Sequence, residues 1–169
     1  SGKGVESFVN AIGASVAVIN VENIRQIRVM VANERFLNMC AIKQDLSDVV
    51  MLSDLVPKYT IPTFIEYIEE SIRLQAPAEF EQPFDVLSVT HWWRIVVTPI
   101  IPTSGAIKYI LLTCIEITEK RRLQAQLDES NLRLKSIVES AYDGIVSVDD
   151  NYTIKVFNKA ACNVFGYHV

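Results

Sequence analysis

The side chains that most often carry catalysis or bind metals are few in this chain and far apart. His91 and His168 are the only histidines, and Cys40, Cys114 and Cys162 show no Cys-x-x-Cys spacing. The sequence contains no Gly-rich phosphate loop, no G-x-S-x-G and no His-Glu-x-x-His motif. We therefore predict no catalytic constellation, no metal site and no enzymatic activity within the 169 residues.

Two other groups of residues allow both a functional and a structural interpretation. Glu66, Glu69 and Glu70 fall at helical spacing, and we interpret them as the exposed face of a helix rather than as acid and base pairs. Trp92 and Trp93 have side chains able to stack on a planar ligand. The interpretation we prefer places one in the core and the other on a covered outer face.

The composition excludes some classes of protein. The formal net charge is −4, which argues against binding nucleic acid through a basic surface. Half of the residues are hydrophobic, which is enough for a core, but no apolar stretch has the length of about 18 residues that a membrane span needs. Together with three cysteines that we interpret as reduced thiols, this predicts a cytoplasmic location without a membrane span in this segment.

One pattern occurs twice along the chain. Residues 143–149 correspond to residues 14–20, and residues 154–158 correspond to residues 29–33, so the first copy has a hairpin loop four residues longer. In the second copy two short apolar runs flank Asp149-Asp150-Asn151, which is typical of a tight turn. A period of this length indicates tandem domains rather than a solenoid.

The second copy resembles the opening of a PAS domain: strand, turn, strand, then Asn-Lys-Ala-Ala and Phe-Gly-Tyr at residues 158–161 and 165–167. Residues 116–120, Glu-Ile-Thr-Glu-Lys, resemble the Asp-Ile-Thr-Glu exit signature of that family, where the last strand passes into a signalling helix. Because Glu116 replaces the shorter aspartate, we do not carry over contacts that depend on that side chain. Ile117 and Thr118 complete the signal exit, with Thr118 a helix N-cap.

The resemblance implies an α+β fold for most of the chain. We expect residues 1–118 to form one PAS-like domain, a five-stranded antiparallel sheet with helices on one face. A linker helix should span residues 119–141, and residues 142–169 should be the incomplete start of a second PAS-like unit. The expected strands are 16–21, 27–32, 84–90, 91–101 and 106–117. The expected helices are 34–42 and 63–74, and residues 48–56 should be a short helical or irregular piece.

The linker contains no Gly or Pro, and a seam of residues follows it at alternating spacings of four and three. In the strand at residues 106–117, apolar residues occupy both faces, which indicates that both faces are covered. We predict a parallel homodimer through the linker helix and the outer face of the sheet. The seam consists of Leu123, Leu127, Ser130, Leu134, Ile137 and Ala141.

In the PAS family the ligand pocket lies between the central helix and the inner sheet face. The sequence lacks the Gly-Arg-Asn-Cys-Arg-Phe-Leu-Gln signature of flavin-binding members, and the expected central helix has no histidine to bind haem. We therefore expect no cofactor, and either a small apolar ligand or, slightly favoured, a core filled by side chains. The candidate lining residues are Val18, Met30, Met39, Phe64, Ile68, Trp93, Ile95, Ile110 and Leu112.

By resemblance, the chain is a sensory or regulatory module of a larger bacterial signalling protein. The output domain, a histidine kinase, diguanylate cyclase or nucleotide cyclase, would lie outside this chain. Two alternatives stay open: a module that binds nothing and serves for dimerisation and relay, and a haem- or flavin-bearing redox or light sensor.

Overall fold

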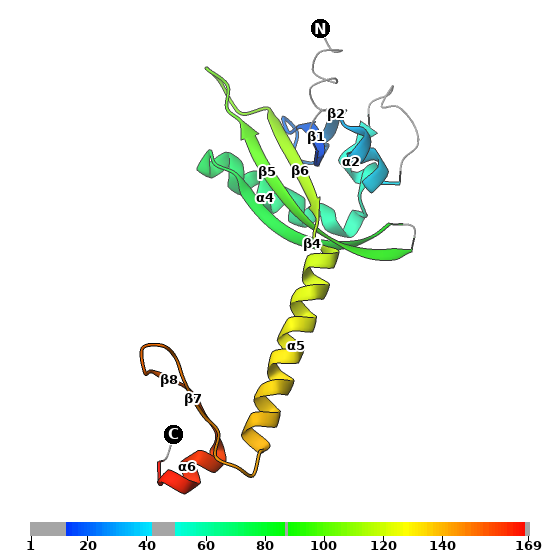
Figure 1. Ribbon diagram of the computed structural model, residues 1–169. Coiled ribbons are helices and arrows are strands. Elements are labelled where there is room, and N and C mark those ends of the chain that lie inside the picture. Colours follow the sequence, from blue (N-terminus) through cyan, green and yellow to red (C-terminus); the bar gives the residue numbers. More distant parts are fainter. Residues whose placement is uncertain (1–12, 42–49, 87, 168–169) are drawn as a thin grey trace. The chain divides into compact units, whose positions relative to one another are not determined.

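The computed structural model describes residues 13–41, 50–86 and 88–167, in two compact units, residues 1–118 and 119–169 (Figure 1). The elements of the first unit are β1 (Ser15–Asn20), β2 (Arg28–Ala32), α2 (Glu34–Met39), β3 (Val50–Met51), α3 (Leu52–Leu55), η1 (Lys58–Thr60), α4 (Ile61–Leu74), β4 (Ala78–Val86), β5 (Val89–Ile100) and β6 (Tyr109–Glu116). Those of the second unit are α5 (Thr118–Ser140, its first residue still in the first unit), β7 (Val146–Val148), β8 (Ile154–Phe157) and α6 (Lys159–Phe165).

The first unit is built on an antiparallel sheet with the order β3-β2-β1-β6-β5-β4. The sheet has six strands rather than the expected five, because Val50 and Met51 add a short strand beside β2, in a segment expected to be helical or irregular. Strand β4 begins at Ala78, six residues earlier than expected. Pro83 lies within β4 at the edge of the sheet, where a missing backbone N–H is tolerated.

The helices of the first unit pack on one face of this sheet, α2 against β1 and α4 against β4 and β5 (Figure 1). Helix α4 has Pro62 in its first turn, as the sequence predicts, and buries Phe64 and Ile68 one turn apart. On the inner face of the strands, Phe80, Ile95, Val97, Ile110 and Leu112 complete the core.

Asn33 ties the start of β1 to the start of α2. Its side-chain Oδ1 accepts the backbone N–H groups of Val16 (3.0 Å) and Phe36 (2.9 Å), and its Nδ2 donates to the Ala14 carbonyl over 2.7 Å. The residue is 1% exposed. A buried backbone N–H without an acceptor is costly, so this one side chain satisfies groups of two elements at once.

Asn158 makes the same contacts in the second unit. Its Oδ1 accepts from Ile145 (2.8 Å) and Ala161 (3.0 Å), and its Nδ2 donates to the Asp143 carbonyl over 3.0 Å and to the Val138 carbonyl over 2.8 Å. Strand pairing repeats as well, since the hairpins β1–β2 and β7–β8 shift register at corresponding positions. The internal repeat predicted from the sequence is therefore present in the structure.

The substitution Asn33→Ala tests how much the first unit depends on this side chain. Loss of the helix cap and of the acceptor for the buried Val16 N–H should lower the free energy of unfolding by about 2–4 kcal/mol. Urea unfolding followed by tryptophan fluorescence reports on this unit, because Trp92 and Trp93 both lie in it. The control Asn38→Ala, at an exposed site on α2, should change stability by less than about 0.5 kcal/mol. Equal effects of the two substitutions would contradict the assignment.

Candidate functional site: the exit from the sheet into α5

The last strand of the sheet reaches α5 through hydrogen bonds among His91, Trp92, Glu116 and Thr118, which together with Ile117 we call the exit junction. The Thr118 hydroxyl donates to Glu116 Oε1 over 3.1 Å and accepts the Trp92 backbone N–H over 2.9 Å. The Ile117 backbone N–H donates to the Trp92 carbonyl over 2.8 Å, and Ile117 is buried. The first residue of α5 is therefore fixed to β5 as well as to β6.

His91, like Trp92, is a member of the exit junction that the sequence did not predict. Its Nδ1 lies 2.6 Å from Glu116 Oε1. Because an ionised carboxylate only accepts hydrogen bonds, Nδ1 carries the hydrogen. The hydrogen bond from His91 lowers the pKa of Glu116 below its ordinary value, against the smaller opposing effect of burial. Glu116, which stands where the Asp-Ile-Thr-Glu signature has aspartate, therefore contacts both Thr118 and His91.

The predicted seam residues lie on α5, except for one. Leu123, Leu127, Leu134 and Ile137 are each 53–57% exposed within the single chain. Ser130 is exposed as well, and Ala141 follows the last residue of the helix. The seam therefore forms an apolar stripe that nothing covers in the described part of one chain.

Seven of the nine predicted pocket residues lie in one buried cluster on the inner face of the sheet: Met39, Phe64, Ile68, Trp93, Ile95, Ile110 and Leu112. Val18 and Met30 do not belong to that cluster. Val18 alternates with Ala17 and Ile19, which are the core residues of β1, so it faces the opposite side. Met30 is 50% exposed because it is the extra residue of a bulge: Val31 and Val29 pair with consecutive residues of β1.

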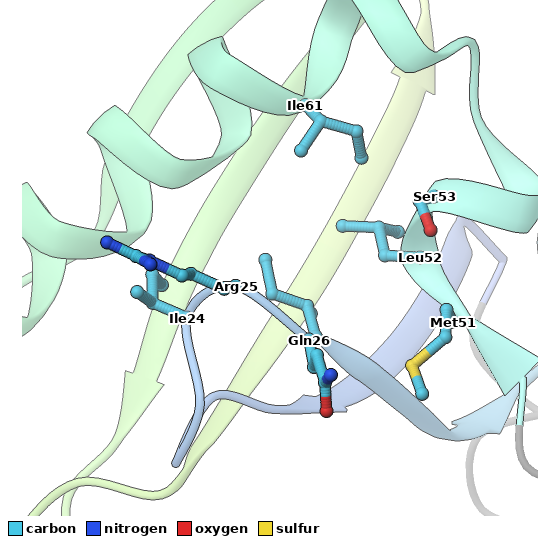
Figure 2. A pocket seen from close by; sticks show the side chains of 8 residues that line it. Ile24, Arg25, Gln26, Met51, Leu52, Ser53 and Ile61 are labelled. Atoms are coloured by element: carbon cyan, nitrogen blue, oxygen red, sulfur yellow. The ribbon is translucent and has the colours of Figure 1, made fainter.

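A small pocket lies beside the core, lined from the β1–β2 loop, the β3–α3 segment and the first residue of α4 (Figure 2). Its apolar side is formed by Leu52 and Ile61, and its polar groups come from Arg25, Gln26 and Ser53. Its volume is about 210 Å³. Pockets that enclose organic ligands usually hold about 300–1,000 Å³, so this one is small for a cofactor.

The cysteines offer little reactivity. None of the three forms a disulfide, and burial raises the pKa of Cys40 to about 12 and the pKa of Cys114 further. A thiol with such a pKa is a poor nucleophile and a poor metal ligand at neutral pH. Within residues 13–41, 50–86 and 88–167 there is no group of three His, Cys, Asp or Glu side chains placed to hold a metal ion. His168 lies outside these ranges.

Residues 132–169 match a family model described as a PAS domain. Over these residues the chain is similar to a PAS domain. The matched residues hold Asn158 and the hairpin β7–β8, whose hydrogen bonds recur around Asn33 in the first unit. No curated protein sequence matches the chain.

Solved structures share the PAS fold with this chain. A PAS domain from Colwellia psychrerythraea aligns with a TM-score of 0.55 at 10% identity, covering 69% of this chain and 97% of that one. A LOV protein from Rhodobacter sphaeroides aligns at 0.54 and 13% identity, over 69% of this chain and 66% of its own. An RNA-binding light-oxygen-voltage receptor aligns at 0.60 and 13% identity, over 78% of this chain and 37% of its own. At these identities the likeness establishes the α+β PAS fold with its antiparallel sheet and helices.

Across the described residues, no helix has both the length and the apolar character needed to cross a bilayer. Helix α5, the longest, is polar along much of its surface.

The exit junction predicts a pH dependence that Glu116→Gln removes. Since the folded pKa of Glu116 is lowered, its contribution to stability is complete above the unfolded pKa of about 4.3 and is lost as the pH falls below it. The side chain is 47% exposed, so we expect only about 0.5 kcal/mol between parent and variant at pH 6. This difference should shrink toward zero at about pH 3. Tryptophan-monitored urea unfolding at both pH values measures it.

The control for this comparison is Glu79→Gln, at an exposed position on the edge strand β4. The difference in unfolding free energy between the parent and Glu79→Gln should be the same at pH 6 and at pH 3. A Glu116→Gln effect that stays constant from pH 6 to pH 3 would show that the carboxylate does not support the junction.

Proposed function

We propose that the chain is the sensory part of a signal-transduction protein and that it has no catalytic activity of its own. In this proposal the first unit responds to a signal, and α5 carries the response to an output domain outside residues 1–169. The observation that carries the proposal is the exit junction. The junction joins the neighbouring strands β5 and β6 to the first residue of α5, a helix of 23 residues.

The contacts of the exit junction make a relay physically reasonable. Trp92 lies on β5 and Glu116 on β6, so a shift between these strands changes the positions of both groups that bond Thr118. Residue Trp93 follows directly on β5 and lies in the core. A change in the core therefore has a short covalent and hydrogen-bonded route to the start of α5.

Dimerisation through α5 and the outer sheet face belongs to the same proposal. The outer face of β5 and β6 presents Val96 and Leu111, which are half-buried, and Ile115, which is 46% exposed. A helix of this length is marginal in water by itself. Pairing the seams of two chains would bury leucines that each contribute roughly 1.5–3 kcal/mol.

A flavin- or haem-bearing sensor is the second candidate, and the likeness to LOV proteins is the reason to keep it. The buried cluster of the first unit argues against it, because its side chains fill the inner face of the sheet, where the resemblance implies the ligand pocket. Absorption bands in the visible range from purified protein would support a cofactor. Their absence, together with dimerisation, would favour the relay module.

The double substitution Leu127→Asp and Leu134→Asp tests the proposed relay helix. Placing two charges in the seam should weaken the dimer by at least tenfold, since each replaces a leucine that the proposed dimer would bury by a group that must stay hydrated. Sedimentation equilibrium of the full chain measures the dissociation constant.

Leu132→Asp is the matched control, because Leu132 lies on α5 outside the seam and is 69% exposed. It should leave the dimer unchanged. If the doubly substituted protein dimerises as tightly as the parent, α5 is not part of the dimer interface and the proposed relay is wrong.

A further inference from the structure

A second depression of the first unit lies where β1 begins and β6 ends. Its volume is about 560 Å³, within the range of small-molecule sites. Helix α2 and the start of β1 line one side, and the first half of β5 and the end of β6 line the floor and the opposite rim. The described lining residues are Gly13, Ala14, Ser15, Arg35, Asn38, Trp93, Cys114, Ile115 and Glu116.

Charged groups of opposite sign face this depression without neutralising each other. Arg35 and Asn38 are three residues apart on α2, so they share one face of the helix. Neither side chain has a hydrogen bond or ion pair with another described residue, and both are exposed donors. Glu116 on the opposite rim uses only Oε1 for His91 and Thr118.

The floor between these charges is apolar and aromatic. Trp93 is 7% exposed and Cys114 2% exposed, and both side chains lie on the inner face of the sheet. Ile115 also lines the depression, but its side chain belongs to the outer face.

We infer that this depression binds a small zwitterion, an α-amino acid with an apolar side chain. Its carboxylate would bind Arg35 and Asn38, its ammonium group the free oxygen of Glu116, and its side chain would lie on the floor. One cation and one amide suit a singly charged carboxylate. A phosphate, with more negative charge, would be repelled by the Glu116 rim.

The site rests on the proposed sensory function and supplies its signal. Glu116 both lines the depression and accepts the hydrogen bond from Thr118 at the start of α5. An ammonium group bound to the free oxygen of Glu116 draws negative charge away from Oε1 and so weakens its hydrogen bonds to His91 and Thr118. Occupancy of the depression and the attachment of α5 are thereby linked through one side chain.

Calorimetric titration of the full chain with L-phenylalanine tests the inference. We expect saturable binding of one molecule per chain. The comparison compounds 3-phenylpropionate, which lacks the ammonium group, and 2-phenylethylamine, which lacks the carboxylate, should bind at least tenfold more weakly. No binding of L-phenylalanine, or equal binding of 3-phenylpropionate, would overturn the assignment.

Variants locate the site. Arg35→Gln, at an exposed position, should weaken L-phenylalanine binding about tenfold or more. Arg73→Gln on α4 is the control and should bind as the parent does. Glu116→Gln should abolish the preference for L-phenylalanine over 3-phenylpropionate. Unchanged binding by Arg35→Gln would overturn the site. Dimerisation is measured separately from binding. A chain that dimerises through α5 but does not bind L-phenylalanine would refute the amino-acid site and leave the proposed relay through α5 unaffected.

Discussion

The hydrogen bonds of one buried asparagine set the geometry of each unit. Asn33 fixes the start of β1 against the start of α2, and β1 then pairs along its length with β6, from Ser15 opposite Cys114 to Asn20 opposite Tyr109. The end of β6, and with it Glu116, is placed by that pairing. Because the side chain is buried and its partners are backbone groups, its loss would leave those groups without their hydrogen bonds.

From this constraint follows the position of the exit junction. Antiparallel pairing sets Trp93 opposite Glu116, which brings His91 and the Trp92 backbone N–H beside the point where the chain leaves the sheet. Thr118 then bonds to both strands before α5 begins. The same placement puts Glu116 at the rim of the depression that α2 lines. One carboxylate therefore lines the depression and also accepts the hydrogen bond of Thr118, the first residue of α5.

Features that depend on local sequence were predictable, and features that depend on strand register were not. Short sequence motifs made three features predictable: the repeat, Pro62 at the start of α4 and the exit residues 116–118. Strand β3 has only two residues, too few for any periodicity. The bulge at Met30 and the alternation of Val18 with the core residues Ala17 and Ile19 keep both side chains off the inner face. The role of His91 required knowing which residues of β5 and β6 are paired.

The most direct test of the coupling between sheet and helix is amide hydrogen exchange in Thr118→Val, which keeps the shape of the side chain and removes its hydroxyl. The exit junction predicts faster exchange of the Trp92 amide, which loses its acceptor, and of the α5 amides at residues 122–126, with Ile95 and Leu112 at the centre of the sheet unchanged. If the Trp92 amide and the first turns of α5 exchange as in the parent, Thr118 does not hold α5 to the sheet and the relay has no structural basis.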